Sequence, residues 1–212
     1  MTSTPYKVLR ATSWLGLFGP VFFFSLLGFL GTMWPGYSPI ATGMSELGAV
    51  NSPVKTIMNF LGFSTLGITI TVFAVGLYNY LRSDWQLKLA SLFVLIAGLG
   101  MIVVGFLPCD PNCIDTTIIG HSHSLVSMIP AIIMPIGAMV SAHSLAKRWG
   151  NAWGRLFFAL GFLSLLSGPI MFLDSTISYT GLIQRLGIGG SLLWMMIVST
   201  KILLENKDKD KK

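Results

Sequence analysis

Residues 106–124, FLPCDPNCIDTTIIGHSHS, join two strongly apolar segments and decide how this chain is divided. The stretch holds both cysteines, two of the three histidines and two of the eight acidic residues. Ionisable side chains are costly inside hydrocarbon, so a polar cluster between two apolar segments is expected at one end of a membrane-spanning bundle. The stretch therefore predicts a loop between two spanning helices, where polar side chains gather.

The composition points to the same class of protein. Of the 212 residues, 53% are hydrophobic and only 10% are charged. Soluble domains carry about 25% charged residues, and a soluble fold of this composition would expose a large apolar surface. A bilayer-spanning helix needs about 20 apolar residues, which leaves room for six helices with short loops. The sequence predicts an all-α polytopic membrane protein with one domain over residues 1–205.

Turn-forming and charged residues separate the apolar segments into six predicted helices, with approximate ranges 12–33, 54–81, 89–107, 120–146, 156–173 and 181–204. The first segment has the basic start of a signal peptide. Its apolar run is too long for one, and no small-residue cleavage site follows, so we predict a retained helix. Residues 206–212, NKDKDKK, carry mixed charge with nothing to bury and are predicted to be disordered.

Basic residues are divided unevenly between the two faces that six spans create. Twelve of the 14 Lys and Arg residues fall on the face that carries the termini, and only Lys55 and Arg185 fall on the other. The positive-inside rule then predicts a multi-pass protein of the cell membrane with both termini in the cytoplasm. Because the basic residues flank apolar segments and form no patch with aromatic residues, the net charge of +6 does not indicate a nucleic-acid partner.

Small residues recur at heptad spacing along several predicted helices, as in Gly98 and Gly105 or Gly154 and Gly161. Small side chains let helix backbones approach closely in lipid. These stripes are therefore predicted to face the inside of the bundle.

Polar residues from several segments are predicted to meet at the outer end of the bundle as a candidate site; they are Ser45, Glu46, Asn59, Asp110, His121, His123, Asp174 and Arg185. Asp174 and Arg185 are expected to pair across a short loop, since a lone charge there is expensive. His123 lies on the inward stripe of its helix, whereas His121, two residues earlier, points roughly the opposite way unless it precedes the helix. The structural alternative for His123 is a hydrogen bond to a neighbouring serine or carboxylate.

Cys109 and Cys113 lie in a loop predicted to be outside the cell, where disulfides persist, and the intervening Pro–Asn pair can fold the chain back. A disulfide is the prediction; free thiols and metal ligation are the alternatives. No cofactor is predicted. Should a metal bind, zinc with Asp110 and His123 among its ligands is the candidate, although the spacing fits no standard zinc motif.

Two functional hypotheses follow, and the sequence leaves open whether the protein is an enzyme. The first is a non-enzymatic protein that binds a lipid, a small molecule or a partner helix through a polar cavity at the outer end. Its expected partners are membrane lipid and either another membrane protein or a second copy of itself. The alternative is an intramembrane metal-assisted hydrolase acting on lipid head groups. The chain contains no G-x-S-x-G, H-E-x-x-H or P-loop motif that would mark a nucleophile, zinc or phosphate site.

The chain resembles DUF998, a family of small prokaryotic membrane proteins of unknown function. Three places carry the resemblance: the SELG sequence at 45–48 followed by Asn59, the run GFLPCD at 105–110 continuing to Cys113, and a histidine that opens the fourth helix. The sequence GLIQR at 181–185 is a weaker similarity to the same family. The resemblance implies six helices and no established activity, and both His121 and His123 match the family's single histidine.

Overall fold

The computed structural model describes residues 3–80, 83–171, 173 and 178–209. Within these residues every regular element is helical, and six helices are long and apolar enough to cross a membrane. The predicted all-α fold with six spanning helices is confirmed, and the protein is a multi-pass membrane protein.

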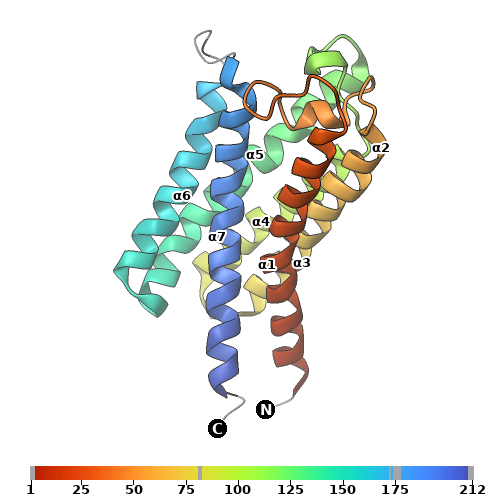
Figure 1. The fold of residues 1–212 in the computed structure, drawn as a ribbon. Coiled ribbons are helices and arrows are strands. Elements are labelled where there is room, and N and C mark those ends of the chain that lie inside the picture. The colour runs from red at the N-terminus through yellow and green to blue at the C-terminus, as the bar shows by residue number, and fades with distance from the viewer. Residues whose placement is uncertain (1–2, 81–82, 172, 174–177, 210–212) are drawn as a thin grey trace.

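The spanning helices form a closed ring that follows the order of the chain (Figure 1). Each helix packs against the next one along the sequence, and the first also packs against the last. The second span is interrupted by a wider π-helical turn, η2 (Met58–Ser64), between α2 (Lys55–Ile57) and α3 (Thr65–Tyr80). The other spans are α1 (Ser3–Thr32), α4 (Trp85–Val104), α5 (Ile118–Trp149), α6 (Asn151–Ile170) and α7 (Thr180–Lys209).

Two helices begin earlier in the sequence than the apolar pattern predicted, because capping residues precede them. Helix α4 begins at Trp85 rather than near residue 89, because the Asp84 carboxylate accepts a hydrogen bond from Leu87 N at 3.0 Å. Helix α5 begins before residue 120, because the Thr117 hydroxyl accepts one from Gly120 N at 3.1 Å. Such side chains satisfy N–H groups that the first helical turn leaves without partners.

The corner predicted between residues 146 and 156 is wrong. Helix α5 continues to Trp149 and α6 begins at Asn151, so Gly150 alone separates them. Its φ of +102° lies in a region that glycine adopts without steric cost, which allows the chain to reverse within one residue.

The terminal segments are also more helical than predicted. Helix α1 already begins at Ser3, in the polar lead before residue 12. Helix α7 continues to Lys209, past the residue at which the disordered tail is predicted to begin, and residues 210–212 lie outside the described part of the chain. Glu205, bound by neighbouring helices as described below, extends the packing of α7 beyond its apolar run.

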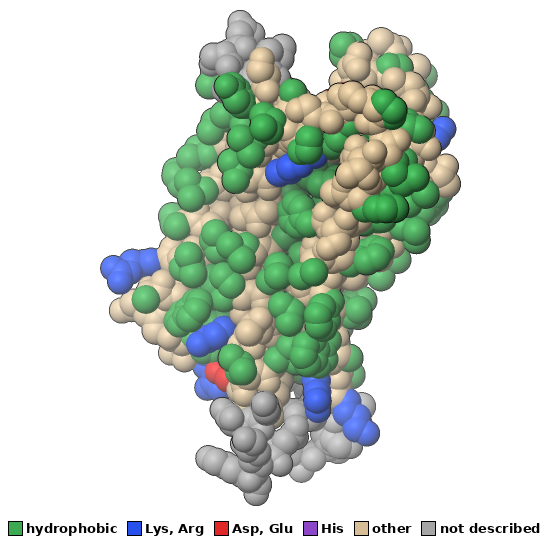
Figure 2. All heavy atoms as spheres, viewed as in Figure 1, with side chains coloured by type: hydrophobic (Ala, Val, Ile, Leu, Met, Phe, Trp, Pro, Cys, Tyr) green, Lys and Arg blue, Asp and Glu red, His purple; other side chains and the backbone are tan. Residues whose placement is uncertain are grey.

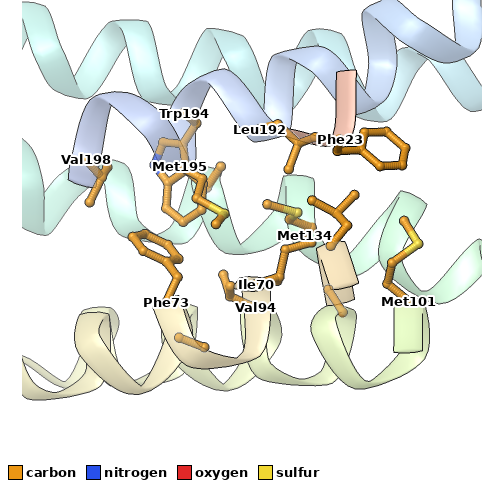
Figure 3. Packing of buried hydrophobic residues seen from close by; sticks show 14 of the residues in the cluster. Phe23, Ile70, Phe73, Val94, Met101, Met134, Leu192, Trp194, Met195 and Val198 are labelled. Atoms are coloured by element: carbon orange, nitrogen blue, oxygen red, sulfur yellow. The ribbon is translucent and has the colours of Figure 1, made fainter. Parts of the chain in front are cut away.

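The core lies along the ring axis, where Phe73, Trp194 and Met195 are almost completely buried (Figure 3). Close backbone approach accompanies this packing. A Cβ atom added at Gly67 would lie 2.7 Å from the carbonyl oxygen of Gly98, so α3 and α4 touch through their backbones. A Cβ atom added at Gly98 would lie 2.7 Å from Thr71 N and 3.0 Å from the Gly67 carbonyl oxygen, so Gly98 faces the neighbouring helix, as the heptad spacing predicted.

The two ends of the bundle differ in construction. Helix α1 begins and α7 ends at the same end, called here the terminal end (Figure 1). The opposite, loop end carries two short 3₁₀ turns, η1 (Ser45–Gly48) and η3 (Pro111–Cys113). Figure 2 shows hydrophobic side chains over the middle of the visible face, and most of its Lys and Arg side chains near the terminal end. This distribution matches a bundle whose middle faces lipid.

Candidate functional site

The segment that follows α1 folds over the loop end and bonds to opposite sides of the ring. Its residue Ile40 accepts a hydrogen bond from Leu182 N of α7 at 2.9 Å. Further along, Val50 N donates to the carbonyl oxygen of Cys109 at 2.9 Å. The segment thereby connects the α4–α5 loop with the start of α7.

Cys109 and Cys113 form the predicted disulfide, with their Cα atoms 5.1 Å apart. Asn112 and Cys113 both have positive φ angles, of 57° and 50°, as the chain turns back on itself. The buried Cys109 sulfur lies 3.4 Å from the carbonyl oxygen of Ser45, so the disulfide loop packs directly against η1.

Asp110 organises the loop that leads into α5. Its buried carboxylate accepts hydrogen bonds from the backbone N–H groups of Thr116 and Thr117, both at 2.7 Å. The hydroxyls of the same two threonines donate at 3.1 and 2.9 Å. The Thr116 N–H bond comes first among the contacts that lower the pKa of Asp110 to about 2. Four donors therefore hold Asp110 as a carboxylate, and its acceptor sites serve the loop.

The two loop-end histidines have different environments. His121 is exposed, and its Nδ1 lies 3.4 Å from an Asp115 carboxylate oxygen. His123 is buried, and its Nδ1 bonds to the carbonyl oxygen of Leu107. The Nε2 atom of His123 has no hydrogen-bond partner among the described residues. The hydrogen bond expected for His123 is thus made to backbone, and His121 carries the carboxylate contact.

Arg185 lies in the first turns of α7, beneath the segment that follows α1. Its guanidinium donates to the carbonyl oxygens of Thr42 at 3.2 Å and Gly181 at 2.8 Å, and to the hydroxyl of Tyr37. Burial raises the pKa of Tyr37, and the positive charge of Arg185 opposes that shift. No carboxylate among the described residues lies within 4.0 Å of the guanidinium.

The neighbouring residue Gln184 attaches η1 to α7. Its side-chain oxygen accepts from Met44 N at 2.6 Å, and its amide nitrogen lies 3.4 Å from the Ser45 hydroxyl. Glu46 closes the same turn by accepting from Gly43 N at 2.8 Å. Ser45 and Glu46 therefore lie beside the start of α7.

Asn59 lies in the π-helical turn of the second span, and its amide donates to the Gly48 carbonyl oxygen at 3.0 Å. A Cβ atom at Gly48 would lie only 2.1 Å from Asn59 Oδ1, so this approach requires glycine. The other hydrogen-bonding atom of the amide, Oδ1, has no partner in the described part of the chain.

The candidate residues thus divide into two clusters around η1. One contains Ser45, Glu46 and Arg185, and the other contains Asp110, His121 and His123; Asn59 approaches η1 through Gly48. No hydrogen bond or ion pair between described residues joins Glu46, Asp110 and His123 to one another. Asp174 lies outside the described residues, so its expected pairing with Arg185 is not part of this geometry.

Sequence reasoning missed several residues that complete these clusters. Thr117 precedes an apolar run, which is the usual position of a helix N-cap, so a signal for it was present. Tyr37 carries no such signal, because its partner Arg185 is 148 residues away in the sequence.

A polar junction at the terminal end was missed as well. Glu205 accepts hydrogen bonds from Arg148 Nε and Nη2, both at 3.1 Å, and from Trp149 Nε1 at 2.8 Å. The hydroxyl of Tyr80 donates to the same carboxylate. Glu205 therefore joins α3, α5 and α7.

Comparison with known proteins assigns the fold to a family. A family model described as "Protein of unknown function (DUF998)" matches residues 17–201. The chain belongs to this family. It is also 27% identical over 154 residues to the protein-methionine-sulfoxide reductase heme-binding subunit MsrQ of Pasteurella multocida (strain Pm70). That match covers 69% of this chain and 73% of the relative. No solved structure matches this DUF998 protein significantly.

Proposed function

We propose that this protein is a non-catalytic binding protein of the membrane, and that its loop end recognises the anionic head group of a lipid or lipid-like small molecule. Arg185 carries the proposal. Its guanidinium is held in place by neutral oxygen atoms, and no described carboxylate within 4.0 Å neutralises it. A fixed guanidinium presents a fork of N–H donors that matches phosphate and carboxylate groups.

The orientation is part of the proposal. With the terminal end in the cytoplasm, as the distribution of basic residues predicts, the Arg185 cluster lies in the outer leaflet. The first turns of a spanning helix end near the head-group region, where Arg185 would meet the polar part of a lipid while α7 faces its chains.

The alternative, a metal-assisted hydrolase, receives less support from the geometry. The carboxylate of Asp110 already accepts four hydrogen bonds, which occupy its acceptor sites and leave it little capacity to act as a base or ligand, and Glu46 accepts a hydrogen bond within its own turn. The zinc candidates Asp110 and His123 point to different partners. Among the described residues no group of three or more His, Cys, Asp or Glu side chains could hold a metal ion.

Heme appears in the name of the relative, so the fit of a heme to this chain matters. Cofactor sites inside helical bundles are built from side chains on facing helices. Here the only histidines, His121, His123 and His143, all lie on α5. Two of them cannot ligate one iron from opposite sides within a single chain, so a bis-histidine heme does not fit. The relative's name as a subunit does support the predicted membrane partner, either another protein or a second copy of this chain.

Binding of phosphatidylglycerol to the delipidated, detergent-solubilised protein tests the proposal, with bound lipid counted by native mass spectrometry and phosphatidylcholine as the neutral comparison. Arg185→Gln should weaken phosphatidylglycerol binding at the loop end about tenfold, seen as about one fewer retained lipid per protein, because it removes charge-assisted hydrogen bonds. Arg185→Lys should retain part of the binding. Lys55→Gln is the matched control, since Lys55 is the other basic residue of this end, and it should bind like the unmodified protein. Equal binding by the Arg185→Gln and Lys55→Gln variants would refute the proposal.

A further inference from the structure

A cavity of about 550 Å³ opens between α5 and α6 near the terminal end. It is well separated in the chain from the loop-end clusters, and none of their residues lines it. Its volume falls within the range of small-molecule sites in proteins. Its polar lining residues are His143, Asn151 and Arg155, and the remaining lining residues are Ala142, Ala146, Gly154 and Phe158.

Small residues bring the two helices into contact beside this cavity. A Cβ atom at Gly154 would lie 2.5 Å from the Ala146 Cβ and 2.9 Å from the Ala142 carbonyl oxygen. The helices therefore touch through small groups, and the longer side chains of His143, Arg155 and Phe158 border the adjoining space.

The charge of this cavity is one-sided. No acidic residue lines it, and neither Arg155 nor His143 forms an ion pair or hydrogen bond with any residue that the structure describes. The contrast with Arg148 is direct, because that guanidinium is bound by the Glu205 carboxylate. Arg155 thus offers a positive charge without a described carboxylate partner beside a shallow, open cavity, which favours an anionic ligand.

An apolar surface continues from the cavity along α6. The rings of Phe158 and Phe162 are stacked, with centroids 6.4 Å apart, and the two residues are 50% and 45% exposed. They lie one turn apart and lead from Arg155 toward the middle of the span. A ligand with a charged head and a hydrocarbon chain would satisfy both parts of this surface.

We propose that the α5–α6 cavity binds a phosphate-bearing anion, with the phosphate at Arg155 and His143 and, where the anion is a lipid, an acyl chain along Phe158 and Phe162. Basic pockets between spanning helices are known to hold anionic lipid head groups. This site is independent of Arg185 and lies at the opposite end of the bundle. The α5–α6 cavity is therefore expected to bind its anion even if the loop end binds no ligand.

The test measures phosphatidylglycerol retention by native mass spectrometry in the full chain, and binding of inorganic phosphate and glycerol phosphate by thermal shift. In the Arg185→Gln background, which removes the loop-end site, we expect Arg155→Gln to weaken phosphatidylglycerol binding about tenfold without a further fall in the melting temperature, since Arg155 is exposed and bonded to no described residue. The affinity of Arg155→Lys for phosphatidylglycerol should lie between that of Arg155→Gln and that of the protein with Arg155 intact. Lys147→Gln is the matched control, because Lys147 is an exposed basic residue one turn from His143 that does not line the cavity.

Phe158→Ala separates the two sources of phosphate. It should weaken binding of the lipid and leave the water-soluble phosphates unchanged. An Arg155-dependent shift with inorganic phosphate alone supports the site with a free anion as its ligand. If Arg155→Gln and Lys147→Gln, each made in the Arg185→Gln background, retain phosphatidylglycerol and both soluble phosphates equally, the proposal is overturned.

Discussion

The two ends of the bundle use polar side chains in different ways. At the loop end, Asp110, Asn59 and Arg185 bond largely to backbone N–H and carbonyl groups of irregular segments. At the terminal end, the Glu205 carboxylate bonds only to side chains, which come from two other helices.

The reason lies in the backbone. Loops leave N–H and carbonyl groups without helical partners, and these groups are costly to bury unless side chains bind them. Short corners such as Gly150 leave few such groups. Polar side chains of the terminal end are therefore free to connect helices, as Glu205 does, or to line a cavity, as Arg155 does.

The largest effect is expected at the junction of three helices. Glu205→Ala should reduce the free energy of unfolding by about 2 kcal/mol, because it leaves the partly buried donors of Trp149 and Tyr80, and the exposed guanidinium of Arg148, without their shared acceptor. Thermal unfolding in detergent measures this loss. A double-mutant cycle with Arg148→Ala should show coupling, and strictly additive effects would contradict the junction.

Removal of the disulfide should have the next largest effect. The double variant Cys109→Ser, Cys113→Ser should lose about 2 kcal/mol, as expected for a cross-link that closes so short a loop. Hydrogen exchange should accelerate in η1 and at residues 105–117 and stay unchanged around Glu205. Faster exchange at both ends would show that the two ends are not independent.

Acid should weaken the loop end through Asp110. Its pKa is about 2 in the folded protein, below the ordinary value of 3.8, so its contribution to stability is complete above about pH 4 and is lost as the pH falls toward 2. The melting temperature should fall by several degrees over this window, as part of general acid unfolding. Asp110→Asn should start from a lower melting temperature at pH 7 and show a shallower decline. A decline identical to that of the unmodified protein would exclude this role.

The smallest effect is expected where one partly buried hydrogen bond is lost at the terminal end. The Ser144 hydroxyl donates to the Asp84 carboxylate at 2.7 Å. Burial opposes ionisation of Asp84, but the Ser144 bond and backbone N–H groups outweigh it and lower its pKa. Ser144→Ala should cost about 0.5–1 kcal/mol in unfolding free energy. Ser122→Ala is a suitable control, since that hydroxyl bonds only within its own helix.

The apolar pattern predicted much of the fold, but it predicted the helix ends least accurately. Six spans, the cysteine pair and the inward direction of Gly98 were all predicted correctly. The early start at Asp84 and the one-residue corner at Gly150 were not, although both residue types are known helix-end signals. Hydropathy measures the length of a span in lipid, whereas caps and turns depend on single hydrogen bonds and φ angles.

The sequence by itself determined that the chain spans a membrane six times, because apolar length and sparse charge are local properties that lipid selects directly. Tertiary structure alone decided which polar groups meet. Arg185 with Tyr37, and Glu205 with Tyr80, lie 148 and 125 residues apart in the sequence. Their contacts depend on the order and tilt of helices around the ring, which no local pattern of residues encodes.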